Sequence, residues 1–181
     1  GDIVNGDTLL GILAHYLKST GAFEKSKEVV GTKMTNLGLD NYLKTLDLEL
    51  FRTKVGDRYI TERMLQTGAF FGGEASGHII FKNYSNTGDG ILAAIKTIEC
   101  MLFFDKGLDE LSEEIELYPQ ELINVSVKEK RPFEEIDSLV KMKQKVEKEL
   151  GDKGRVLLRY SGTEPKARVM IEAEDPYLTR S

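Results

Sequence analysis

Short apolar runs alternate with longer stretches of helical periodicity through about the first hundred residues, and this alternation constrains the fold more than any other feature. The pattern predicts strands at 28–34, 48–53, 70–71 and 79–81. It predicts helices at 7–20, 36–46, from 57 onward and at 90–104. Strands that alternate with helices are typical of an α/β domain with a mainly parallel sheet, in which ligands bind at loops after the strands. We expect such a domain over residues 1–110.

Individual positions in these helices lead to more specific expectations. Asp7 is predicted to cap the first helix, because a carboxylate can accept hydrogen bonds from the free N–H groups of a first turn. In the helix from Asp57, the residues Ile60, Met64 and Leu65 are expected to face the core. Cys100 lies on an apolar helical stretch and is interpreted as a packed thiol rather than as a nucleophile.

A second, smaller module is expected over residues 119–181, after a hinge at 111–118. Residues 121–127 predict a strand, and residues 133–150 predict a charged helix that ends at Gly151. Two further apolar runs, at 156–158 and 169–171, flank a polar loop. We interpret this module as an α+β domain whose polar loop joins two strands.

Composition excludes several functional classes. The chain has 181 residues and a net charge of −5, which argues against general nucleic-acid binding. A single cysteine excludes a disulfide within the chain, and two histidines with one cysteine exclude a zinc site formed by this chain alone. No apolar run has the length of a membrane span, and we expect a cytoplasmic location.

The polar loop of the second module has the chemistry needed to hold a phosphate group. Arg159 offers forked donors that match phosphate oxygens, and Arg168 follows just beyond the loop. Ser161 and Thr163 add hydroxyl donors, while Gly162 lets backbone N–H groups approach an anion closely. The residues alone leave open a polar hairpin turn that binds no ligand.

A second polar cluster lies in the first module, between the apolar runs 70–71 and 79–81. Glu74 and Ser76 offer a carboxylate and a hydroxyl that can hydrogen-bond sugar hydroxyls. His78 can donate to an oxygen or move a proton near neutral pH. The alternative is a glycine-rich turn whose histidine only caps a strand.

Taken together, these loops resemble those of the α-D-phosphohexomutase superfamily, and within it the bacterial phosphoglucosamine mutases. The matching segments, in family order, are 30–39, 52–59, 73–78, 87–90 and 159–165. The resemblance covers nearly the whole chain. Two departures are Ala75, where the family often has glutamine, and Tyr160, where it often has proline.

The resemblance implies a role for each loop and also exposes what the chain lacks. It implies that Glu74, Ser76, His78 and Arg58 bind the sugar. It implies that Arg159, Ser161, Gly162, Thr163 and Arg168 hold the phosphate that does not react. Family members have four domains, of which the first carries a phosphorylated serine and the second an Asp-x-Asp-x-Asp-Arg loop that binds Mg²⁺. Neither motif occurs in this sequence.

We therefore expect this chain to be the C-terminal half of such a mutase, namely domains three and four. On this interpretation it binds a phosphorylated amino sugar, depends on the missing N-terminal domains of the same protein, and has no catalytic residue, metal ligand or turnover of its own. Two alternatives stay open. One is the same half of a phosphomannomutase or phosphoglucomutase, and the other is a stand-alone phosphosugar-binding module without catalysis.

Overall fold

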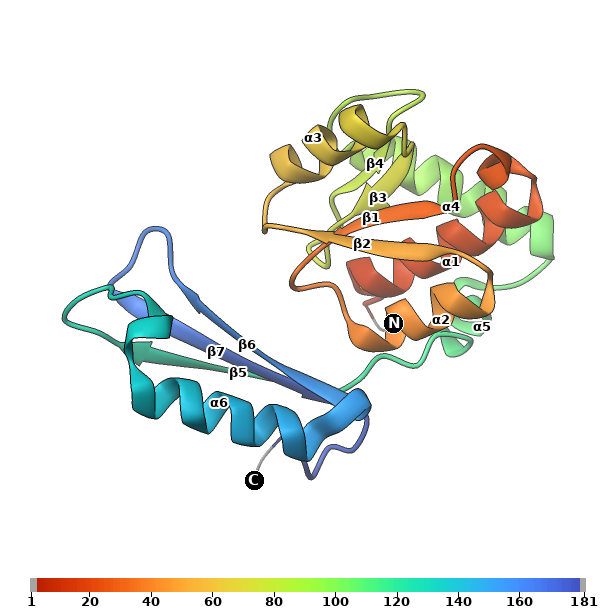
Figure 1. Cartoon of the computed structure of the whole chain (residues 1–181). Helices are drawn as coiled ribbons and strands as arrows, with labels where there is room; N and C mark the ends of the chain where they lie inside the picture. The colour runs from red at the N-terminus through yellow and green to blue at the C-terminus, as the bar shows by residue number, and fades with distance from the viewer. Residues whose placement is uncertain (1–2, 180–181) are drawn as a thin grey trace. The chain divides into compact units, whose positions relative to one another are not determined.

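The computed structural model describes residues 3–179 and divides into two compact units, Gly1–Leu117 (unit 1) and Tyr118–Ser181 (unit 2). Each unit has its own sheet (Figure 1).

Unit 1 contains a four-stranded sheet in the order β2-β1-β3-β4. Its strands are β1 (Glu28–Thr32), β2 (Glu49–Thr53), β3 (Phe71–Gly73) and β4 (Ile79–Phe81). Strand β1 pairs in parallel with both β2 and β3, whereas β4 runs antiparallel to β3. The prediction of a mainly parallel α/β sheet is confirmed.

Helices cover both faces of this sheet (Figure 1). They are α1 (Gly6–Ser19), α2 (Leu37–Thr45), α3 (Asp57–Thr67), α4 (Gly90–Phe104) and α5 (Leu108–Glu113), with a short 3₁₀ turn η1 (Ala22–Glu24). The core is split accordingly. Val30 and Ile80 point from the sheet toward Ile60 and Met64 of α3, while a larger cluster joins the other face to α1 and α4.

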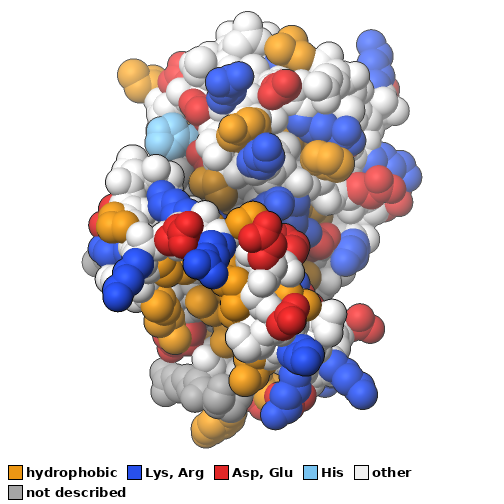
Figure 2. Space-filling model, turned by 60° about the vertical axis from the view of Figure 1, so that its left-hand side comes forward, with side chains coloured by type: hydrophobic (Ala, Val, Ile, Leu, Met, Phe, Trp, Pro, Cys, Tyr) orange, Lys and Arg blue, Asp and Glu red, His pale blue; other side chains and the backbone are white. Residues whose placement is uncertain are grey.

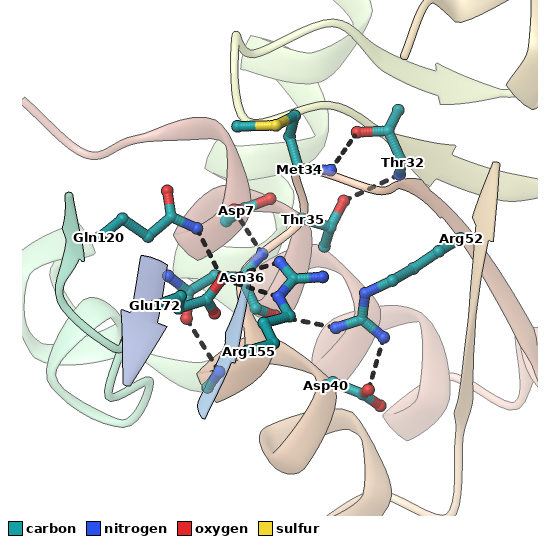
Figure 3. Close-up of polar contacts among 11 residues, drawn as sticks. Asp7, Thr32, Met34, Thr35, Asn36, Asp40, Arg52, Gln120, Arg155 and Glu172 are labelled. Atoms are coloured by element: carbon teal, nitrogen blue, oxygen red, sulfur yellow. Dashed lines mark hydrogen bonds and ion pairs between the residues drawn. The ribbon is translucent and has the colours of Figure 1, made fainter. Parts of the chain in front are cut away.

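Two expectations about these helices are wrong. Asn5, not Asp7, caps α1, because the Asn5 side chain accepts a hydrogen bond from the Thr8 N–H at 2.9 Å. The Asp7 carboxylate instead accepts the N–H of Asn36, 29 residues further along the chain, at 2.9 Å (Figure 3). Leu65, expected to face the core, is 66% exposed, because a core of Val30, Ile60, Met64, Ala69 and Ile80 already fills this side of the sheet.

Helix α4 has one buried face and one exposed face, although nearly all of its residues are apolar. Cys100 is fully buried, as expected of a packed thiol. Ile91, Ile95, Ile98 and Leu102 recur at helical spacing and are 49–77% exposed, so they form an outer apolar face.

The segment 111–118, expected to act as a hinge, begins inside the core of unit 1. Leu111 and Ile115 are 3% and 6% exposed and belong to the larger cluster. Hinge motion in this segment stays a prediction. No helix in the described part of the chain is long and apolar enough to span a membrane.

Unit 2 is an antiparallel three-stranded sheet with one long helix, as expected for the smaller module. The sheet order is β5-β7-β6, with β5 (Gln120–Ser126), β6 (Gly154–Tyr160) and β7 (Lys166–Ala173). The helical region consists of η2 (Phe133–Glu135), α6 (Asp137–Leu150) and η3 (Gly151–Lys153), and Ile136 interrupts it with a non-helical ψ of 86°.

The two faces of the unit 2 sheet differ in character. Phe133, just before α6, stacks on Tyr160 with ring centroids 4.2 Å apart, which places the Tyr160 side chain on the α6 face. Because side chains alternate along a strand, Arg159 lies on the opposite face.

On the surface drawn in Figure 2, charged side chains of both signs are interspersed and hydrophobic side chains form patches between them.

Candidate functional site

The carboxyl ends of three neighbouring strands in unit 1 meet at one edge of the sheet. Strands β1, β2 and β3 end at Thr32, Thr53 and Gly73, and the first two of these residues are register partners. The loops that follow are 33–36, 54–56 and 74–78. Ligands bind at this edge in open α/β sheets, so the topology brings the predicted sugar-binding segments to a suitable place.

The 74–78 loop is a tight connection between β3 and β4 that closes on itself. The Glu74 N–H donates to the His78 carbonyl at 3.2 Å, and the Gly77 N–H donates to the Glu74 carbonyl at 2.9 Å. Gly77 has a φ of +90°, a conformation that favours glycine over any residue with a side chain. The loop backbone is therefore largely fixed by its own hydrogen bonds.

Helix α1 contacts this loop at its first residue, Gly6. The Gly6 N–H donates to the Ala75 carbonyl at 3.1 Å. A Cβ atom at position 6 would lie 2.4 Å from the Glu74 oxygen and 2.5 Å from the Gly77 nitrogen, which is closer than atoms can approach. Only glycine at position 6 lets the start of α1 touch the loop.

The Glu74 carboxylate is held at the start of α3. Its Oε1 atom accepts the N–H of Gly56 at 2.9 Å, and Gly56 precedes the first residue of α3 and offers no capping side chain. A carboxylate is favoured there because the helix N-terminus carries a partial positive charge. The second oxygen of Glu74 makes no hydrogen bond or ion pair with any other described residue and is available to a ligand hydroxyl.

Ser76 and His78 form a hydroxyl–imidazole pair. The Ser76 Oγ and His78 Nδ1 atoms lie 3.0 Å apart, and which atom donates depends on the tautomer of the histidine. Since this contact uses Nδ1, the Nε2 atom of His78 stays available. Glu74, Ser76 and His78 thus present a carboxylate, a hydroxyl and a ring nitrogen within five residues.

Arg58 is placed differently. Its guanidinium makes no ion pair with any residue in the described range 3–179, and its side chain lines a shallow cavity of about 450 Å³ on the outer side of α3. Leu65 and Thr87 line the same cavity. Asp57 receives the Arg58 N–H at 2.7 Å, which is a local contact at the helix start.

The side chains of Thr35 and Asn36 in the 33–36 loop, by contrast, make hydrogen bonds that stabilise the fold. The Thr35 hydroxyl accepts the Thr32 N–H at 2.9 Å, and the Asn36 side chain caps α2 by accepting the Gly38 N–H at 2.8 Å (Figure 3). Arg52 donates to Asp40 at 2.6 Å.

In unit 2, Arg159 and Arg168 are direct partners across the ladder between β6 and β7. The Nε atoms of both side chains are buried and have no hydrogen-bond partner among the described residues. Burial lowers the pKa of Arg159 from its usual value, and the neighbouring positive charge of Arg168 lowers it further. Two guanidinium groups with unmet donors and mutual repulsion form a site that an anion would stabilise.

The 159–165 loop adds hydroxyl and backbone donors next to this pair. The Ser161 side chain is almost fully buried, and its oxygen accepts the Glu164 N–H at 3.2 Å, which leaves its O–H free to donate. Glu164 neutralises part of the charge, since it pairs with Lys166 at 2.7 Å and with Arg168 at 3.2 Å. These contacts lower the pKa of Glu164, with the Lys166 hydrogen bond as the largest cause.

Gly162 and Thr163 lie exposed at the tip of the loop. A Cβ atom built at Gly162 would meet nothing within 4 Å, and its φ is not in the range that favours glycine. Neither packing nor backbone conformation in the free chain therefore requires glycine at position 162. A ligand that approaches the backbone closely would require it.

Sequence reasoning missed three contacts that hold these loops. Lys130 donates to the Ser161 carbonyl at 2.6 Å, the Gly56 N–H binds Glu74, and Gly6 supports the 74–78 loop. Each joins residues more than 15 positions apart, so no local pattern marks the contact.

In the described part of the chain, no group of three His, Cys, Asp or Glu side chains is placed to hold a metal ion. The residues present therefore do not fit a Mg²⁺ site.

The fold and its two loops define a phosphohexomutase-like pair of domains. The family model for the α/β/α domain III of phosphoglucomutase/phosphomannomutase matches residues 5–118, and the model for the C-terminal domain of these enzymes matches residues 122–181. The chain belongs to the phosphoglucomutase/phosphomannomutase family, which confirms the resemblance drawn from the motifs.

The curated relatives show which members of this family the chain resembles. A phosphoglucosamine mutase of Nitratidesulfovibrio vulgaris (strain Miyazaki F) is 47% identical over 97% of this chain, and one of Bacillus pumilus is 45% identical over 99%. The chain spans only 39% and 41% of the lengths of these two relatives.

Among solved structures, Aspergillus fumigatus N-acetylphosphoglucosamine mutase in complex with GlcNAc-6P and magnesium superposes with a TM-score of 0.83 at 19% identity. That match covers 99% of this chain and 45% of the other. A phosphomannomutase-like protein of Thermus thermophilus superposes with a TM-score of 0.63 at 25% identity and covers 97% and 38% of the two chains. The first of these similarities shows a shared fold.

Proposed function

We propose that this chain is the sugar- and phosphate-binding part of a phosphoglucosamine mutase, which interconverts glucosamine 6-phosphate and glucosamine 1-phosphate. The observation that supports this most directly is the Arg159–Arg168 pair beside a loop of hydroxyl and backbone donors. The buried Nε atoms of this pair have no hydrogen-bond partner in the part of the chain that the structure describes. The names of the curated relatives favour an amino sugar as the substrate.

In this proposal the two units have separate tasks. Arg159, Arg168, Ser161 and Thr163 bind the phosphate that does not react, and Gly162 lets that phosphate approach the loop backbone. Glu74, Ser76 and His78 bind the hydroxyl groups of the sugar. Arg58 adds a positive charge near the start of α3. Because these contacts involve no reacting atom, they serve binding and orientation.

The chemical step belongs to parts of the mutase that this sequence does not contain. A phosphoserine would give its phosphoryl group to the substrate and receive one back, through a bisphosphate intermediate, which leaves the number of phosphates unchanged. Mg²⁺ would likewise be held outside this chain, since the described residues offer no ligand set. We therefore expect no turnover by this chain alone, and we place the mutase in the cytoplasm.

A titration with glucosamine 6-phosphate, followed by NMR, tests the binding role. We expect amide shifts confined to residues 74–78 and 159–168, and their loss from the second region in Arg159→Ala. Lys145→Met provides a matched control, since it removes a positive charge from the exposed surface of α6. Saturating ligand without shifts in either loop would refute binding by the free chain.

Activity is tested on a longer protein that contains this chain together with a serine and metal loop of the family type. Glucosamine 6-phosphate should be the preferred substrate over mannose 6-phosphate and glucose 6-phosphate. The family model also covers phosphomannomutases, and Ala75 departs from the common glutamine. A preference for mannose 6-phosphate would assign the chain to that branch. Activity of the pure 181-residue chain would contradict the proposed division of tasks.

A further inference from the structure

The connection between β5 and α6 contacts both ends of the 159–165 loop. At one end, the Val127 N–H donates to the Pro165 carbonyl at 2.9 Å. At the other, Lys130 Nζ donates to the Ser161 carbonyl at 2.6 Å, and the Tyr160 hydroxyl donates to the Arg131 carbonyl at 2.6 Å. Residues 127–133 thus hold the loop at three points.

An aromatic stack completes this contact. The rings of Phe133 and Tyr160 are nearly parallel, at an interplanar angle of 14°, with centroids 4.2 Å apart. Tyr160 is therefore fixed both through its ring and through its hydroxyl, immediately before Ser161. Side chains alternate along β6, so this fixation occupies the α6 face and leaves the Arg159 face to a ligand.

We propose that Tyr160 and Lys130 are positioning residues for phosphate binding, which hold the loop donors in their binding geometry without touching the ligand. This inference rests on the proposed phosphate-binding role of the same loop. The physical reason is that an immobilised loop loses less conformational entropy when it binds. The Lys130 hydrogen bond also pairs the Ser161 carbonyl with a cation.

The ladder geometry adds a specific prediction about proline at position 160. The Ser161 N–H donates to the Lys166 carbonyl at 2.8 Å, so residues 161 and 166 form a hydrogen-bonded pair. Such pairs alternate with non-bonded ones in an antiparallel ladder, which makes Tyr160 and Ala167 a non-bonded pair. The N–H of Tyr160 is thus not needed by the sheet, and proline can restrict the backbone there by other means.

Four variants of the chain test this inference, with glucosamine 6-phosphate and inorganic phosphate as the probes. We expect Tyr160→Ala to raise the Kd about tenfold, and Tyr160→Phe, which keeps the stack and loses only the hydroxyl, to raise it about threefold. Lys130→Met should act like Tyr160→Phe, because it removes one hydrogen bond. Tyr160→Pro should restore binding relative to Tyr160→Ala. Lys128→Met is the matched control, since Lys128 is exposed and makes no hydrogen bond or ion pair with the described residues of the loop.

Amide hydrogen exchange separates positioning from general stability. Tyr160→Ala and Lys130→Met should accelerate exchange at residues 161–164 and leave β5 and β7 protected. A Tyr160→Ala variant that binds like the unchanged chain, while Arg159→Ala loses binding, would overturn the inference and leave the proposed function intact. Absence of binding by the unchanged chain would overturn both. Equal losses of phosphate affinity in Lys130→Met and Lys128→Met would show that the effect comes from the overall charge of the protein, and would overturn the role of Lys130.

Discussion

Arg159 and Arg168 face each other across two hydrogen-bonded strands, and the Nε atoms of both are buried without a hydrogen-bond partner in the described range 3–179. Like charges placed directly opposite each other in a sheet are destabilising. The free chain therefore tolerates an unfavourable contact, which a bound phosphate would convert into a favourable one.

Replacement of Arg159 by methionine should separate binding from stability. Because the change removes a repulsion, the free energy of unfolding of the free chain should not fall by more than about 0.5 kcal/mol. Binding of glucosamine 6-phosphate should weaken about tenfold or more, since a charge-assisted contact contributes about 1.5–3 kcal/mol. Urea unfolding and a ligand titration measure the two quantities. A large loss of stability with unchanged affinity would show that Arg159 supports the fold instead.

Gly162→Ala should have opposite effects on folding and on binding. Nothing lies within 4 Å of the added methyl group, and the φ angle does not require glycine. The alanine variant should be more stable by about 0.4–1 kcal/mol, because its unfolded chain has fewer conformations. Phosphate affinity should nevertheless drop, since the methyl group occupies the space over the loop backbone. Thermal unfolding and titration check this pair of results, and unchanged affinity would remove Gly162 from the site.

Glu74 offers a comparison between charge and hydrogen bonding. Glu74→Gln keeps an oxygen that can accept the Gly56 N–H and should preserve stability to within about 0.5 kcal/mol. Glu74→Ala loses both the acceptor and the charge at the start of α3, and should cost about 1 kcal/mol. Both variants should weaken sugar binding. If Glu74→Gln binds the sugar as well as the unchanged chain, the role of the carboxylate is structural.

Gly6→Ala should disturb the 74–78 loop although Gly6 has no side chain to contact a ligand. The new methyl group would overlap the backbone of residues 74, 75 and 77, and we expect a loss of about 1–3 kcal/mol with weaker sugar binding. Gly90→Ala is the control, because a Cβ at position 90 meets nothing within 4 Å. Denaturation of both variants gives the comparison, and equal stability would mean that α1 does not support the loop.

Cys100 should make stability depend on pH in the alkaline range. Burial, and to a smaller extent the charge of Glu114, raises the pKa of the Cys100 thiol from 9.0 to about 11. Between these values the unfolded chain releases a proton that the folded chain keeps, so the free energy of unfolding falls as the pH rises. The contribution is fully present below pH 9.0 and lost as the pH passes about 11.

The Cys100→Ala variant isolates this effect from other groups that titrate in the same range. Relative to that variant, the unchanged chain should lose about 1 kcal/mol between about pH 8 and about pH 10. Urea unfolding at several pH values measures the difference. Parallel pH profiles for the two chains would contradict the raised pKa.

The sequence predicted the sheet and both loops because their signals are local. Apolar runs, glycines and clustered polar residues mark the strands expected at 70–71 and 79–81 and the 74–78 loop directly. The Asp7 prediction failed because Asn5 and Asp7 are both good caps, and only the distant N–H of Asn36 decides between them. The Leu65 prediction failed because consecutive helical residues lie about 100° apart around the axis, which places Leu65 outside the face shared by Ile60 and Met64. Its apolar side chain alone suggested burial.

The residues that support the site could not be predicted from local sequence patterns, because their contacts join distant parts of the chain. Lys130 lies 31 residues from Ser161, in a stretch whose charges look like an ordinary solvated surface. Its contact with Ser161 follows only from the antiparallel sheet, because strand pairing brings the segment after β5 next to the 159–165 loop.

The outer face of α4 gives the isolated chain a surface that water wets poorly. This face carries Ile91, Ile95, Ile98 and Leu102, whose side chains are 49–77% exposed. Exposed apolar patches promote association, and salts that strengthen the hydrophobic effect increase that tendency. The solubility of the 181-residue chain should therefore decrease in ammonium sulfate sooner than its net charge of −5 suggests.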